Sequence, residues 1–194
     1  MFRTLWVICL LAVAAAPATA QDEMLRFGNA AMAEGAFDAA VLAYAGAVPA
    51  LEAAHGPMSV PVADALARQA FALGAMGRYG EAIPLAEQAV AIVDQSVGRN
   101  DRGAAFALAA LALLLRSSAP GHHETRFADV ADPLAWRSLE LLEQAPGPDT
   151  ADVGRMLNGY ADLLHFAARD VEGADFEERL ARLGVTRAAI LPTP

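Results

Sequence analysis

The chain has 194 residues, with 14 basic and 23 acidic side chains and a formal net charge of −9. Nucleic-acid binding depends on Lys and Arg side chains that neutralise phosphates, so this acidic balance argues against a nucleic-acid partner. The single cysteine, Cys9, lies within the first 20 residues, which excludes redox chemistry and thiolate metal sites from the rest of the chain. Acidity would suit a basic partner, but it also simply keeps a protein soluble.

The first 20 residues have the pattern of a secretory signal. Arg3 supplies a positive charge, Leu5–Ala16 is an unbroken apolar run, and Ala18 and Ala20 are small residues in front of a cleavage site. Such a run rises only about 18 Å as a helix, against a hydrocarbon core of about 30 Å, so a membrane anchor is the less favoured alternative. We therefore predict cleavage after Ala20 and a periplasmic or secreted protein without a stable membrane anchor. Without Arg3, 13 basic side chains face 23 acidic ones, a net charge of −10.

Helices are predicted along most of the remaining chain. Apolar residues recur at helical spacing, Gly and Pro interrupt them, and strand-like alternation is absent, so the predicted class is all-α. The first five helices are predicted at about 22–33, 37–54, 60–76, 79–96 and 102–116.

A short phrase occurs twice in this region, 42 residues apart: Gly35–Ala40 (GAFDAA) and Gly77–Ala82 (GRYGEA). The glycine permits a tight turn between antiparallel helices, and the aromatic residue two positions later packs back on the first helix. The alanine that ends each phrase is small enough for two helices to approach closely. Self-similarity at such a period is typical of a helical-hairpin solenoid, in which each unit buries its apolar face on the next.

The pattern changes after residue 116. Residues 117–132 are predicted to be an irregular loop, because the phrase does not recur at Ala119–Gly121. Asp132 followed by Pro133 predicts a helix start, a capping carboxylate before a proline at the first helical position. We therefore expect a degenerate third repeat whose second helix is displaced to about 133–144. Two more helices, at about 150–168 and 175–183, belong to a region 133–190 that continues or caps the solenoid behind the repeats of 21–116.

The segment Ala72–Ile83, followed by Ala86 and Ala89, resembles the turn and second helix of a tetratricopeptide repeat. The spacing is similar to that of the longer repeat of the kinesin-light-chain kind. The resemblance covers about 22–98 and extends to about 116. HEAT-like repeats have a similar period and are the alternative.

The chain departs from the tetratricopeptide pattern at two kinds of position. Leu66 and Ala70 stand where the family usually has Trp and Leu-Gly in the first helix. Pro49 and Pro84 fall within second helices, where a proline removes a backbone donor.

The family resemblance implies a concave groove lined by first helices. It places Leu25, Asn29 and Met32 of the first unit there, and from the second unit Asp64, Ala67, Arg68 and Phe71. We select four of these as partner-binding residues: Asn29, Asp64, Arg68 and Phe71.

Among these residues, Asn29 matches the place where many peptide-binding members hold the ligand backbone, since an amide can both donate and accept. Asn29 and Phe71 are expected to face one another across adjacent units. Leu25 and Asp64 replace the lysines of a carboxylate clamp, so binding of a C-terminal carboxylate is not expected. The competing interpretation is that all these residues only pack a curved solenoid.

Catalytic chemistry has one weak candidate, the loop His122–Glu124 with Asp129 and Asp132 nearby in sequence. Adjacent side chains in a loop diverge, whereas metal sites need ligands on one face, so a solvated polar loop is the preferred interpretation. His165 is predicted to be a half-buried, hydrogen-bonded core residue. A nucleophile elbow, a phosphate loop and a dinucleotide fingerprint are all absent from the sequence.

We therefore predict no catalytic, metal or cofactor-binding residue and no enzymatic activity. The predicted function is binding of a protein or peptide partner in a bacterial periplasm. The alternatives are a structural subunit of an envelope complex and, third, a metal-dependent enzyme that uses His122 and His123. The sequence leaves the partner's identity and the oligomeric state open.

Overall fold

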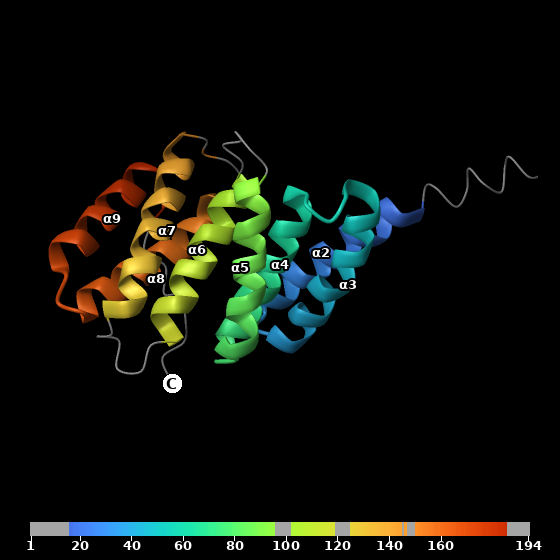
Figure 1. Cartoon of the computed structure of the whole chain (residues 1–194), viewed down its shortest axis with the longest axis horizontal. Helices are drawn as coiled ribbons and strands as arrows, with labels where there is room; N and C mark the ends of the chain where they lie inside the picture. The colour runs from blue at the N-terminus through green and yellow to red at the C-terminus, as the bar shows by residue number, and fades with distance from the viewer. Residues whose placement is uncertain (1–15, 96–101, 119–124, 145, 147–149, 186–194) are drawn as a thin grey trace, which may run out of the picture.

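The computed structural model describes residues 16–95, 102–118, 125–144, 146 and 150–185. These residues form eight helices and no strand, which confirms the all-α prediction (Figure 1). In chain order the helices are α2 (Ala16–Ala33), α3 (Phe37–His55), α4 (Val60–Ala75), α5 (Tyr79–Gln95), α6 (Arg102–Ser118), α7 (Thr125–Gln144), α8 (Thr150–Phe166) and α9 (Asp170–Arg182).

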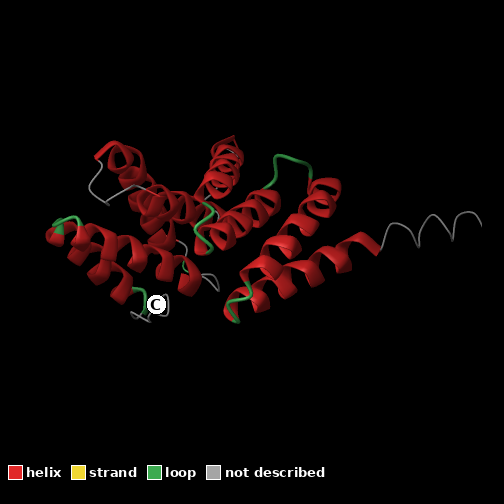
Figure 2. Cartoon of the chain, turned by 90° about the horizontal axis from the view of Figure 1, so that it is seen from below, coloured by secondary structure: helices red, strands yellow, loops and turns green. Residues whose placement is uncertain are grey.

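Successive helices pair as hairpins: α2 with α3, α4 with α5, α6 with α7 and α8 with α9. The hairpins follow one another along the long axis of the molecule, with α2–α3 at one end and α8–α9 at the other (Figures 1 and 2). Contacts between hairpins connect α3 with α4 and α5 with α6, and among the first helices they connect α4 with α6 and α6 with α8. The result is a repeat-like row of helical hairpins.

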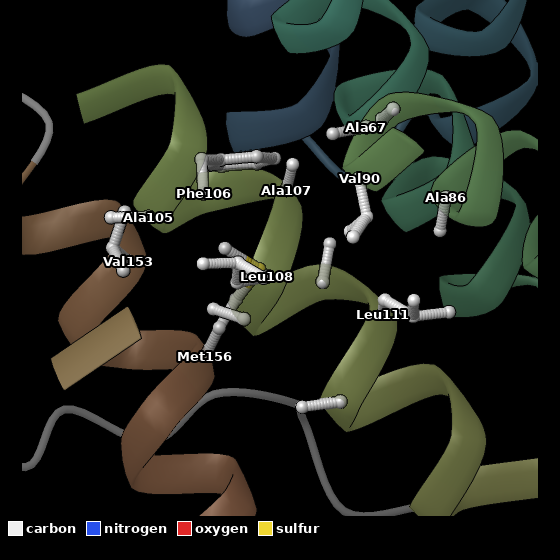
Figure 3. Close-up of a cluster of buried hydrophobic side chains, with 14 of the residues drawn as sticks. Ala67, Ala86, Val90, Ala105, Phe106, Ala107, Leu108, Leu111, Val153 and Met156 are labelled. Atoms are coloured by element: carbon white, nitrogen blue, oxygen red, sulfur yellow. The ribbon is translucent and has the colours of Figure 1, made fainter. Parts of the chain in front are cut away.

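The core is centred on α6, which contacts α4, α5, α7 and α8. Every residue from Ala104 to Ala112 is buried, as expected for a helix that is apolar on all sides. Figure 3 shows Ala105 beside Val153 of α8, with Leu108 directed towards Met156, while α4 and α5 lie on the other side of α6. The middle of the row is therefore its most completely covered part.

Glycine forms the turn in the first two hairpins, as predicted. Gly35 and Gly77 have φ angles of +74° and +73°, in the left-handed region that other residues rarely adopt. The N–H of the next residue donates to the carbonyl five residues earlier, at 2.8 and 3.0 Å respectively, which closes each first helix in a Schellman-type cap. The alanines that end the two phrases, Ala40 and Ala82, are both fully buried.

The turn between α8 and α9 repeats this geometry without a glycine. Ala168 has a φ of +59°, and the N–H of Arg169 donates to the Leu164 carbonyl at 2.9 Å. Five residues after the turn, Gly173 takes the buried place of Ala40 and Ala82, and a Cβ there would lie 2.7 Å from Nε2 of His165. The last two helices thus form a further hairpin. The repeated phrase is not recognisable there in the sequence, because alanine replaces the turn glycine and glycine replaces the buried alanine.

The predicted loop 117–132 is wrong for the residues described there, because all of them are helical. α6 continues to Ser118, and α7 begins at Thr125, so Asp132 and Pro133 lie inside a helix instead of starting one. The reason is that the buried stripe of α7 extends across this point, with Ala131 and Ala135 both fully buried one turn apart. His122 and His123 lie outside the described residues.

Two other boundaries differ from the sequence analysis. α9 begins at Asp170 instead of about 175, because the tight turn at Ala168 allows the helix to start at once. α2 begins at Ala16, so the helix is continuous across the predicted cleavage position after Ala20.

The turn geometry makes opposite predictions for two substitutions. Ala168→Gly should stabilise the fold by about 0.5–1 kcal/mol, because relief of left-handed strain exceeds the entropy that glycine adds to the unfolded chain. Gly77→Ala should destabilise it by about 1 kcal/mol. A Cβ at Gly77 would meet nothing within 4 Å, so its effect reports backbone conformation alone. Chemical denaturation of both variants measures the two changes; a less stable Ala168→Gly variant would contradict the assigned turn.

Candidate partner-binding face

Arg68 connects three of the four predicted partner-binding residues. Its Nε donates to Oδ2 of Asp64 at 2.8 Å, one turn earlier on α4. Its Nη1 donates to Oδ1 of Asn29 on α2 at 3.5 Å. The Arg68 side chain is only 11% exposed, whereas Asn29 is an exposed residue. Asn29, Asp64 and Arg68 are therefore brought together across the first two hairpins.

The orientation of the Asn29 amide follows from its two donors. Arg68 carries only donors, and the Tyr44 hydroxyl also donates to Oδ1, at 2.7 Å. Oδ1 consequently faces the protein and Nδ2 is the outward group; within the described residues Nδ2 has no hydrogen-bond partner. The Asn29 amide was expected both to donate to and to accept from a ligand. Because Oδ1 already accepts two hydrogen bonds from the protein, only donation by Nδ2 remains for a ligand.

Tyr44 was not among the predicted site residues, yet its hydroxyl fixes the orientation of the Asn29 amide. The residue is 1% exposed, and its burial raises the pKa of the hydroxyl to about 12. Its ring crosses α2 at Gly28, where a Cβ would lie 2.6 Å from Cε1 of the ring. The glycine therefore allows the close crossing that brings the hydroxyl to Asn29.

Phe71 belongs to the same face but packs in another direction. Its ring meets the edge of Phe106 on α6, with centroids 6.3 Å apart and planes at 83°. The Arg68 guanidinium also lies over the Phe106 ring, with Cζ 4.5 Å from the centroid, a cation–π geometry. Asn29 and Phe71, which were expected to face one another across adjacent units, are linked through Arg68 and Phe106.

We call Asn29, Asp64, Arg68, Phe71 and Phe106 the Arg68 cluster. It draws on α2, α4 and α6, the first helices of three successive hairpins. Phe106 was not predicted, because the predicted face ended at the second unit, although an aromatic residue on the helix predicted at 102–116 was a usable signal. Since Asp64 already neutralises Arg68, the cluster is suited to a neutral or basic ligand with an apolar side chain, and poorly suited to an anion.

A second cluster of polar side chains joins helices α7, α8 and α9 to one another. Asp132 of α7 accepts hydrogen bonds from the Tyr160 hydroxyl and, at 2.6 Å, from Nη1 of Arg169, which also pairs with Glu172. Burial, together with the bond to Asp132, raises the pKa of Tyr160 far above its ordinary value. These bonds connect α7, α8 and the start of α9, and they give the Asp132 side chain a structural role within α7.

The described residues contain no group of three or more His, Cys, Asp or Glu side chains that could hold a metal ion. His165 is 30% exposed, with Nδ1 3.0 Å from Asp170 and Nε2 3.5 Å from Glu177. Its ring also fills the space left by Gly173. This environment agrees with a hydrogen-bonded packing role for His165.

No protein-family model matches the chain, and no curated protein matches it.

A double-mutant cycle tests the centre of this cluster. Asp64→Ala and Arg68→Ala should each destabilise the fold, and the pair should show a coupling energy of about 1 kcal/mol, because the ion pair is largely shielded from solvent. The free energies of unfolding of the wild type, both single variants and the double variant give this value. The exposed pair Arg78 and Glu81, which are 44% and 60% exposed, is the matched control and should couple more weakly. Additive effects at Asp64 and Arg68 would contradict the arrangement.

Proposed function

We propose that this chain is an exported helical-repeat protein of the tetratricopeptide type that binds a protein or peptide partner through the first-helix face. One observation carries the proposal: the Arg68 cluster connects three successive first helices, with Asn29 at one end and Phe106 at the other. A face that continues across repeats is what an extended ligand requires. The hairpin order supports four units, with α8–α9 as a fourth instead of a mere cap.

The chemistry of the cluster defines the kind of ligand. Asn29 offers Nδ2 as a donor to a backbone carbonyl, and the half-buried ring of Phe71 offers an apolar anchor. Asp64 and the net charge of −10 after cleavage favour a basic or neutral segment over an acidic one. We therefore propose a peptide segment with an apolar side chain and adjacent basic residues, recognised along its backbone and not by its C-terminal carboxylate.

The second candidate is a structural subunit of an envelope complex. The observation that favours it is the mutual packing of Arg68, Phe71 and Phe106, which satisfies these groups without a ligand. In that case these residues would only hold the hairpins together and would bind no peptide. A metal-dependent enzyme that uses His122 and His123 has no support from the described residues.

The capture experiment compares Phe71→Ala with Phe166→Ala in the mature protein. Phe166 is 61% exposed on the last hairpin, so the same truncation there serves as the matched control. If Phe71 is an anchor, capture from envelope extract should weaken by about 1–4 kcal/mol with the helical spectrum unchanged, while the control captures normally. A stoichiometric complex instead of a transient client would favour the structural subunit.

The opposite outcome is equally defined. If Phe71 only packs the core, its truncation to alanine should lower the free energy of unfolding of the protein by about 3–5 kcal/mol. Lost stability together with undiminished capture by the remaining folded Phe71→Ala protein would remove Phe71 from the proposed site.

Export has its own test. Because small residues at 18 and 20 follow an apolar run too short to span a membrane, the mature protein should begin at Gln21. The intact mass of protein from the periplasmic fraction measures this directly. A species that retains residues 1–20 and fractionates with membranes would contradict both cleavage and localisation.

A further inference from the structure

Methionine supplies all the sulfur of the chain after Ala20, because the single cysteine, Cys9, precedes it. The methionines there are Met24, Met32, Met58, Met76 and Met156. Met24 and Met58 are 39% and 49% exposed, whereas Met156 is 1% exposed. Because oxidation of a thioether follows its exposure, an oxidant should reach Met24 and Met58 first.

The two exposed methionines differ in their surroundings. Met24 lies on α2, and its Sδ would be 3.2 Å from a Cβ built on Gly46 of α3, with its Cε 3.9 Å from the same point. The thioether therefore lies against the bare backbone of Gly46. Met58 lies in the connection between α3 and α4, outside any helix. A chemical change at Met24 thus alters a contact between two helices, and Met58 provides an exposed comparison.

The Met24 contact is continuous with the helix crossing that orients Asn29. Gly28 is one turn further along α2 and faces the Tyr44 ring, where a Cβ would lie 2.6 Å from Cε1. Residues four apart lie on the same side of a helix, so Met24 and Gly28 both face α3. The Tyr44 hydroxyl donates to Oδ1 of Asn29 at 2.7 Å. A shift of α2 at Met24 should therefore reach Asn29 through Tyr44.

We propose that Met24 is an oxidation site, at which hydrogen peroxide converts the thioether to a sulfoxide and loosens the first hairpin. The sulfur forms a bond to one peroxide oxygen, the O–O bond breaks, and the other oxygen leaves as water. The sulfur loses the two electrons that reduce the peroxide. The product is a polar side chain in place of a flexible apolar one.

Two features of the contact make a sulfoxide unfavourable there. The sulfur is already closer to the Cβ position of Gly46 than the 3.4–4 Å of an ordinary van der Waals contact, so little space remains for an oxygen on the side of α3. An oxygen that points towards water instead draws the sulfur outward, and the soft thioether contact is lost. In both cases the contact between Met24 and Gly46 weakens. Enzymatic reduction of the sulfoxide should restore it.

Peptide mass spectrometry after limited treatment of the purified protein with hydrogen peroxide shows which methionines have gained an oxygen atom. Met24 and Met58 should be oxidised first and Met156 last. The midpoint of thermal unfolding, followed by circular dichroism, should fall by about 2–4 °C as Met24 is oxidised. Treatment with the two methionine sulfoxide reductases, one for each epimer, should return the midpoint to its starting value.

Three variants assign the effect to one sulfur. Met24→Leu keeps an apolar side chain of similar size without sulfur, so peroxide that oxidises Met58 should leave its midpoint unchanged. Met58→Leu is the matched control and should lose as much as the wild type. Met24→Gln places a polar oxygen at this position without any oxidant, and it should lower the midpoint in untreated protein.

Nuclear magnetic resonance tests the connection to Asn29 in the wild-type protein. The side-chain amide signals of Asn29 should move in proportion to the fraction of Met24 that is sulfoxide, because the Tyr44 hydroxyl orients that amide. In the Met24→Leu variant the same peroxide treatment should leave these signals in place.

Oxidation of Met24 that is slower than that of Met156 would overturn the proposal, as would an unchanged midpoint in protein whose Met24 is fully oxidised. Equal destabilisation of Met24→Leu by peroxide would overturn it too, because another residue would then carry the effect. None of these readouts depends on export or on the capture of a partner, so the proposal stands or fails apart from the proposed function.

Discussion

The burial of α6 on all sides is the constraint on which the molecule depends. Every extensive contact between α2–α5 and α7–α9 passes through this helix. Its neighbours approach closely because small residues face it: Gly74 of α4 lies where any Cβ would collide with Leu114, and Ala105 lies beside Val153. A hairpin alone could not bury its apolar side, and the row exists because α6 offers apolar surface to both halves.

The same helix couples the fold to the candidate site. Phe106 is 4% exposed and belongs to the core, yet its ring supports the Arg68 guanidinium and the edge of Phe71. Arg68 in turn fixes the Asn29 amide together with Tyr44. Groups that would contact a ligand are thus held by groups that hold the hairpins together. This shared support also explains why truncation at the site can affect stability and binding at once.

The first two hairpins were predictable because their signals are local. Gly35 and Gly77 need a left-handed φ, and an aromatic and a small residue follow at fixed spacing. The last two helices were predicted, but the repeat-like turn between them was not recognised, because Ala168 adopts the same φ without being glycine, at an energetic cost that tertiary packing offsets. Asp132 followed by Pro133 predicted a helix start. The structure instead places Asp132 inside α7, where its carboxylate accepts hydrogen bonds from Tyr160 and Arg169. Within the site, Asn29 and Arg68 were selected through the family resemblance, whereas the Tyr44 contact depends on a helix crossing at Gly28 that no local pattern encodes.

Native-state hydrogen exchange tests the central claim, that α6 holds the two halves of the row together. Amides in the buried stretch Ala104–Ala112 should exchange only through global unfolding, while those of α2, α3 and α9 at the ends of the row should exchange through smaller openings. Protection of α6 should therefore equal the full free energy of unfolding. Exchange of α6 at a lower free energy than either end would contradict the account, because the hairpins would then be stable without it.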